Sequence, residues 1–234
     1  MQLKLTLWNV VAFLVFAMLV GEAHEIAHFI VGKILCGCWP VSRDFNAWSL
    51  CDCAQGHWAT IAGPLFSMTL AWIGMFLLRS NLEKRQSFGY FLVWANVPQA
   101  RIMTVLMRGG DERLFFREIL SGTAIQDLYW YVAIAFVLLI ALPPIVAAFR
   151  VVQNKFGWLY NVGFMILPLV VLGSYGFVFL NGLLERGFLS EVWIMGTPLF
   201  ITMHTTTLLV ILIAFLRTHL VSIAKDKSRA LYGG

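Results

Sequence analysis

The sequence predicts an all-α, polytopic membrane protein with about six transmembrane helices. Of its 234 residues, 60% are hydrophobic and only 12% are charged, and the mean hydropathy is +0.80. Soluble domains carry about 25% charged residues, so this composition indicates a chain embedded in lipid. The formal net charge of +5 does not indicate a nucleic-acid partner, because the basic residues lie mainly between the apolar segments, where they act as topology signals.

Six apolar segments each reach the roughly 20 residues that a helix needs to cross a bilayer. They span residues 5–35, 57–78, 88–107, 128–149, 156–180 and 193–216. We expect one integral membrane domain over residues 1–234, with a core at 5–118, additional spans at 128–216 and a basic tail at 217–234. The start of the chain is similar to a secretory signal, but its apolar stretch is longer than a signal core, which predicts an uncleaved first span.

The first segment contains the motif His24-Glu25-Ile26-Ala27-His28. On a helix, His24 and His28 share a face, so both imidazoles can reach one metal ion. Glu25 lies to the side, where it can take a proton from a water at the metal, as the general base does in zinc hydrolases. A carboxylate within a membrane span costs about 2.5–3.5 kcal/mol on insertion scales. The motif therefore predicts a functional zinc site; the alternative is a set of polar side chains satisfied by helix packing.

The loop at 36–56 contains all four cysteines: Cys36, Cys38, Cys51 and Cys53. One residue separates the two members of each pair, whereas common zinc knuckles have two to four. Two disulfides, four free thiols or a second metal site all fit this pattern. The compartment that the loop faces would decide among them.

The second segment begins with His57 and continues with Ala62-Gly63-Pro64. His57 is either an accessory metal ligand or an interfacial histidine at the end of a span. Small residues and a proline in a transmembrane helix allow a neighbouring backbone to approach closely, or kink the helix.

The third segment is the most polar of the six. Asn96, Gln99 and Arg101 are expensive to expose to lipid, so we expect them to line a protein or water-filled interior, with Pro98 breaking the helix. A catalytic zinc site needs three protein ligands, and Asp111 is the best available third ligand; the alternative is a solvated loop acid. The first and third spans run in the same direction, which places Asp111 on the same side of the membrane as the histidine motif.

Together these motifs resemble the site-2 proteases, a family of intramembrane zinc metalloproteases. The similarity consists of the His24–His28 motif in an early span, Ala62-Gly63-Pro64 in the next, and Asn96 and Pro98 followed by Asp111 in the third. It implies that both histidines and the aspartate bind Zn²⁺, that Glu25 activates water, and that the asparagine region binds an unwound substrate helix. Asn96 and Gln99 would then hold the exposed strand.

The function predicted from the sequence is hydrolysis of a peptide bond within or next to a transmembrane helix of a membrane-protein substrate. The expected partners are this substrate and membrane lipid. One alternative is a membrane metal-ion transporter that uses embedded His and Glu as a transit site. A second is a catalytically inactive protein, similar to site-2 proteases, that only binds. In the sixth segment, His204 and Thr205 either line the same cavity or bond between helices.

Two arguments about membrane orientation disagree. Termini on the cytoplasmic side place ten Lys and Arg residues inside and six outside, which the positive-inside rule favours. The cysteine loop would then face the opposite compartment, where disulfides form. The resemblance implies the reverse, because site-2 proteases usually carry the metal nearer the cytoplasmic face.

Overall fold

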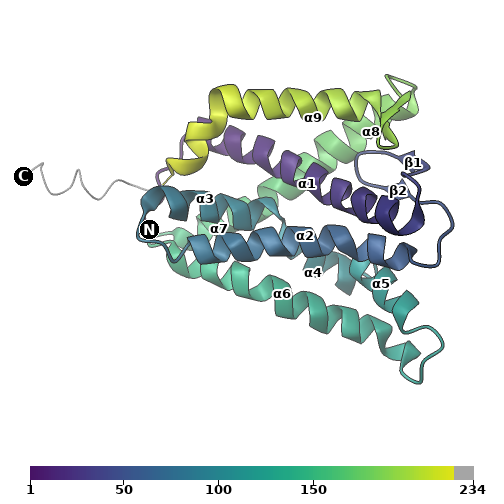
Figure 1. The fold of residues 1–234 in the computed structure, drawn as a ribbon. Coiled ribbons are helices and arrows are strands. Elements are labelled where there is room, and N and C mark those ends of the chain that lie inside the picture. Colours follow the sequence, from purple (N-terminus) through teal and green to yellow (C-terminus); the bar gives the residue numbers. More distant parts are fainter. Residues whose placement is uncertain (224–234) are drawn as a thin grey trace, which may run out of the picture.

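The computed structural model describes residues 1–223, most of which are helical (Figure 1). Within residues 1–223, five helices are long and apolar enough to cross a membrane, and the protein is a multi-pass membrane protein. These are α1 (Leu7–Cys36), α2 (Gly56–Leu77), η1–α6 (Gln126–Leu128 and Tyr129–Val151), α7–η2–α8 (Gly157–Val171, Leu172–Leu180 and Asn181–Glu185), and α9–η3–η4 (Leu199–Ile211, Leu212–Leu216 and Arg217–Val221).

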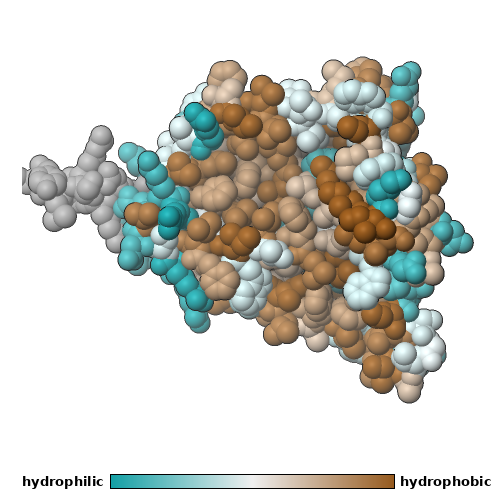
Figure 2. Space-filling view, in the orientation of Figure 1, coloured by the Kyte–Doolittle hydropathy of each residue, from teal (hydrophilic) through white to brown (hydrophobic). Residues whose placement is uncertain are grey.

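The surface is that of a protein in lipid. Figure 2 shows hydrophobic side chains over the middle of one face and hydrophilic residues gathered toward its two ends. Large apolar side chains such as Leu139, Val178 and Phe215 are more than 70% exposed. In water such a patch would mark an interaction site, and on these helices the partner is the bilayer.

The expected third span is divided into α3 (Glu83–Ala95) and α4 (Pro98–Leu106), followed by α5 (Asp111–Ile119). Val97 has φ of 46° in the left-handed region, which is strained for a β-branched residue. Pro98 begins α4, where its missing N–H is harmless. The break predicted at Pro98 is confirmed, and of the six expected spans five are long helices.

The described residues are mostly helical, as predicted, and they also contain two short antiparallel hairpins. Strands β1 (Ser42–Arg43) and β2 (Trp48–Ser49) form an antiparallel hairpin between α1 and α2, and β3 (Val192–Ile194) pairs with β4 (Thr197–Pro198) before α9. Two disulfides enclose the first hairpin, Cys36–Cys53 and, nested within it, Cys38–Cys51. Of the three interpretations of the cysteines, the disulfides are confirmed.

Helix α1 lies between α2 and α9 and contacts both of them, as well as α3 (Figure 1). At one end of the bundle, Phe13 of α1 packs in a buried aromatic cluster with Phe91 and Phe164. Both described ends of the chain lie there too, because the Lys4 N–H donates to the carbonyl of Ile223. The histidine motif lies further along α1.

The basic tail expected at 217–234 is only partly described. Its first residues, Arg217–Val221, continue the last long helix as η4. Lys225, Lys227 and Arg229 lie outside the described residues.

Candidate metal centre

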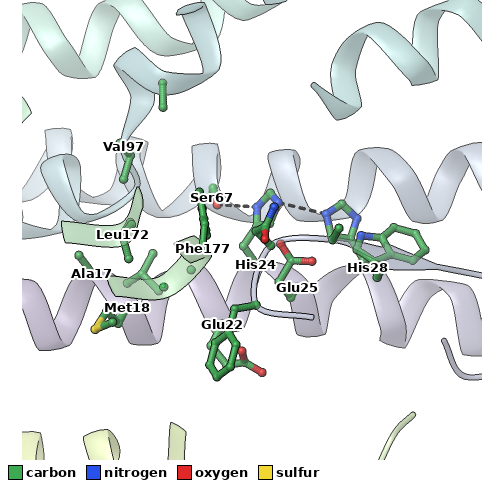
Figure 3. Close-up of a pocket in the computed structure, with 18 of the residues that line it drawn as sticks. Ala17, Met18, Glu22, His24, Glu25, His28, Ser67, Val97, Leu172 and Phe177 are labelled. Carbon is green, nitrogen blue, oxygen red and sulfur yellow. Dashed lines mark hydrogen bonds between the residues drawn. The ribbon is translucent and has the colours of Figure 1, made fainter. Parts of the chain in front are cut away.

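His24 and His28 stand one turn apart on the face of α1 that packs against α2. Both are buried, and their Nε2 atoms are 3.0 Å apart (Figure 3). The sequence predicted that the two imidazoles lie on one face of a helix, and the structure confirms this. They come together because residues four apart share a helix face.

The hydrogen bonds of the two rings define where their protons lie. His28 Nδ1 is 2.7 Å from the carbonyl oxygen of Ala59, which can only accept, so Nδ1 carries the proton. Arg101 Nη2 lies 2.6 Å from His24 Nε2 and 3.1 Å from His24 Nδ1; the shorter contact makes Nε2 the acceptor and leaves Nδ1 to donate to Ser67 Oγ, 2.9 Å away. Both Nε2 atoms are therefore acceptors, and they lie 3.0 Å apart with no hydrogen between them. Two acceptors this close repel unless a cation lies beside them, and imidazoles oriented in this way are typical of metal ligands.

Gly63 in α2 provides the space next to this pair. A Cβ at this position would lie 2.7 Å from His24 Nε2 and closer still to His28 Nε2. No side chain fits there without displacing a ring. Gly63 thus lets the backbone of α2 come close to the Nε2 atoms of His24 and His28.

Asp111, at the start of α5, supplies a third acceptor. Its Oδ2 is 3.7 Å from His24 Nε2 and 3.8 Å from His28 Nε2. Tetrahedral zinc with bonds of about 2.0–2.2 Å places ligand atoms about 3.3 Å apart, and the three measured separations lie around that value. Burial alone would raise the pKa of Asp111, but His24, Arg101 and His28 together hold that pKa well below its usual range, so the carboxylate stays ionised.

Glu25 lies next to the two imidazoles. Its carboxylate comes within 4.8 Å of both histidine nitrogens, and Figure 3 shows it between the two rings. Its Oε2 is buried with no hydrogen-bond partner in the described part of the chain. A buried carboxylate oxygen without a partner is unfavourable and suits a group that exchanges protons with a water at the site.

Two further charged residues belong to the site. Arg101 Nη2 lies 2.6 Å from His24 Nε2, and Nη1 lies 2.9 Å from Asp111 Oδ2. Glu112 is completely buried, with Oε2 3.9 Å from Arg101 Nη1. Burial raises the pKa of Glu112, and Arg101 opposes this shift. The sequence predicted that Arg101 lies in the interior but gave it no role. It did not identify Glu112, because an acid at the start of a helix is usually exposed to solvent.

A cavity of about 710 Å³ opens at the metal centre. Its polar end holds the histidine motif, and Val97, Leu172 and Phe177 line an apolar part (Figure 3). His204 and Thr205 of α9 also line it, so that part of the polar stripe faces the cavity.

Of the two predicted substrate-binding residues, Asn96 lines the cavity and Gln99 does not. The amide nitrogen of Asn96 donates to the carbonyl of Leu92, and its buried Oδ1 has no partner among residues 1–223. The amide of Gln99 donates to the carbonyl of Met165. His57 packs against the ring of Phe115.

The first hairpin forms one wall of the cavity. The Trp48 ring lies 4.9 Å from the His28 ring. Arg43 anchors the hairpin, because it is buried, donates to both carboxylate oxygens of Glu22 at 2.6 Å and donates to Thr197 Oγ1 of β4. Glu22, the other acid of the first span, therefore has a structural role.

Taken together, His24, Glu25 and His28 form a buried group that could hold a metal ion. Neutral imidazoles and carboxylates are the ligands of many zinc sites. Comparisons of the chain with protein-family models, with curated proteins and with solved structures find no match.

Proposed function

We propose that this protein is an intramembrane zinc metalloprotease that hydrolyses a peptide bond within or next to a transmembrane helix of a membrane-protein substrate. One observation carries the proposal: two acceptor Nε2 atoms lie 3.0 Å apart, beside an ionised Asp111 and next to Gly63, which has no side chain to fill the space. His24, His28 and Asp111 would hold the ion. A bound zinc ion supplies Lewis acidity, which polarises a scissile carbonyl and lowers the pKa of a water molecule toward about 7.

Glu25 is the general base. Its Oε2 is unpaired within the described structure and lies beside the two histidines, so it can take the proton of the attacking water. The same carboxyl group then delivers that proton to the leaving amine. Glu22, the other acid of α1, cannot serve instead, because both of its carboxylate oxygens accept hydrogen bonds from Arg43.

The surroundings of the centre suit a substrate that arrives through the membrane. A helical substrate hides its amides in its own hydrogen bonds, so it must unwind before hydrolysis. Asn96 Oδ1 is buried, faces no described donor and lies on the cavity wall, where it can accept from an amide of the unwound strand. Val97 and Leu172 would receive apolar side chains. The pair α3–α4 then forms an interrupted sixth span beside the site.

We also propose that the termini face the cytoplasm and that the metal centre lies toward the opposite side. Disulfides persist in oxidising compartments, and the two disulfides lie in the loop that joins α1 to α2. The balance of Lys and Arg favours the same orientation. In intact cells, a membrane-impermeant reductant followed by an impermeant maleimide should label the cysteines. If the cysteines were labelled only after cell lysis, the opposite orientation would be correct.

The function is tested on purified wild type, Glu25→Gln and Asp111→Ala in detergent, by counting zinc per chain and following cleavage of a panel of transmembrane peptides. Wild type and Glu25→Gln should each hold about one zinc, and Asp111→Ala should lose it. Only the wild type should cleave, because loss of a general base lowers rates by about 10²–10⁴-fold. Cleavage by Glu25→Gln at the wild-type rate would refute the proposal. Zinc flux into liposomes that survives Glu25→Gln but not His24→Ala would support a transporter.

A further inference from the structure

Arg101 presents a cation to the same atoms that would bind the metal. Nη2 donates to His24 Nε2 at 2.6 Å, and Nη1 donates to Asp111 Oδ2 at 2.9 Å. These short, charge-assisted bonds are among the stronger polar contacts in proteins. The guanidinium thus bridges two of the three proposed ligands.

This contact and metal coordination exclude each other at His24. The imidazole Nε2 has a single lone pair, which can accept one hydrogen bond or bind one metal ion. Asp111 Oδ2 has two lone pairs, so the conflict there is one of charge: a guanidinium and a divalent cation at a shared oxygen repel each other strongly in a buried site. Metal binding at His24 therefore requires Arg101 to move.

Glu112 provides a second position for the guanidinium. The residue is fully buried, and neither carboxylate oxygen accepts a hydrogen bond from another residue of the described chain. Its Oε2 is 3.9 Å from Arg101 Nη1, so a shift of about 1 Å would reach the 2.7–2.9 Å of a charge-assisted hydrogen bond. A buried carboxyl group whose oxygens lack hydrogen-bond partners is unfavourable, and the nearby guanidinium can satisfy those oxygens by moving toward them.

We infer that Arg101 is a positioning residue of the metal centre, which moves between the ligand pair His24–Asp111 and the carboxylate of Glu112, so that zinc and the guanidinium bind the ligands in alternation. The inference rests on the metal centre of the proposed function and adds a built-in competitor to it. Arg101 lowers the affinity for zinc by holding the ligands, and Glu112 raises that affinity by accepting the displaced guanidinium.

The test measures zinc affinity by competition with a chromogenic chelator at fixed pH in detergent. The chains compared are wild type, Arg101→Met, Glu112→Gln and the double variant. Arg101→Met should bind zinc at least about ten-fold more tightly, because one charge-assisted contact no longer competes. Glu112→Gln should bind at least about ten-fold more weakly. The double variant should match Arg101→Met, because Glu112 acts only through Arg101.

The control is Arg108→Met, which removes the same charge from an exposed residue two positions beyond α4 that lies over the Trp130 ring. Its zinc affinity should equal that of the wild type. If Arg101→Met does not fold, Arg101→Lys replaces it. A single ammonium cannot hold His24 and Asp111 as the forked guanidinium does, so zinc should still bind more tightly than in the wild type.

Two results would overturn the inference while leaving the metal centre intact. One is zinc binding by the Arg101 variant that equals or falls below that of the wild type. The other is a loss of affinity from Glu112→Gln that is equally large with and without Arg101. A different result would defeat the proposed function together with the inference: no zinc bound by the wild type or by any variant.

Discussion

Replacing Gly63 by alanine adds one methyl group to α2 at the point where the two imidazoles converge. The new Cβ would lie 2.7 Å from His24 Nε2 and nearer to His28 Nε2. Ordinary contact begins at about 3.5 Å, so a ring or the helix must shift by about 0.8 Å or more. Zinc sites tolerate errors of about 0.2 Å in ligand position. The displacement is several times that tolerance.

We expect Gly63→Ala to bind zinc at least about 100-fold more weakly, which corresponds to about 2.7 kcal/mol. The free energy of unfolding should fall by no more than about 2.5 kcal/mol, which is the difference between two opposing terms. Removing a glycine from a helix interior stabilises it by about 0.5–1 kcal/mol. Overpacking opposes this by about 1–3 kcal/mol. The variant should therefore fold and yet lose its metal.

The measurement is zinc per chain and zinc affinity, alongside thermal unfolding in detergent. Gly74→Ala is the matched control, because it adds a methyl to the same helix where the Cβ would lie 2.8 Å from the carbonyl oxygen of Gly89, away from the histidines. Gly74→Ala should lose stability and keep its zinc. Zinc binding of wild-type strength by Gly63→Ala would show that no metal lies between His24 and His28.

Two other changes probe the wall of the cavity. Replacing Cys36, Cys38, Cys51 and Cys53 together by serine opens a loop whose ends are 17 residues apart, which should lower the free energy of unfolding by about 3 kcal/mol; an unchanged melting temperature would contradict this. Glu22→Gln leaves the buried guanidinium of Arg43 without its carboxylate and should lower that free energy by about 3–5 kcal/mol. The exposed Glu118→Gln should change it by less than about 0.5 kcal/mol, and equal effects of these two substitutions would refute the assigned role of Glu22.

The long helices could be predicted because the thickness of a bilayer dictates their length and composition. The break in the third segment could also be predicted, since Pro98 cannot continue a helix. The left-handed Val97 before it could not, because a β-branched residue does not favour that conformation. The two hairpins were missed because their strands are two or three residues long, too short for an alternating pattern to show.

Some residues of the candidate metal centre could likewise be predicted from the sequence, and others could not. The spacing of His24 and His28 dictates their shared face wherever the segment is helical. Asp111 is distant in sequence, and its distance of 3.7 Å from His24 depends on how α5 follows the turn after α4. The charge of Arg101 within an apolar segment predicts that it has a buried acidic or polar partner, but the sequence does not show which residue that partner is. Glu112 gives no signal, because a glutamate in the first turn of a helix is ordinarily solvated and favoured there by the helix dipole.

The two acids of the first span show what decides between a structural and a chemical role. Glu22 and Glu25 lie in the same helix and the same apolar stretch, so the price of placing either in a membrane span is similar. Glu22 recovers that free energy through two hydrogen bonds from Arg43. Glu25 has an oxygen that no described residue satisfies, beside two histidines whose acceptor Nε2 atoms lie 3.0 Å apart. A buried carboxylate oxygen without a partner, beside residues that could hold a metal ion, is free to accept a proton. The structure therefore gives Glu22 a role in the fold, and Glu25 is the acid to which we assign the chemistry of the proposed function.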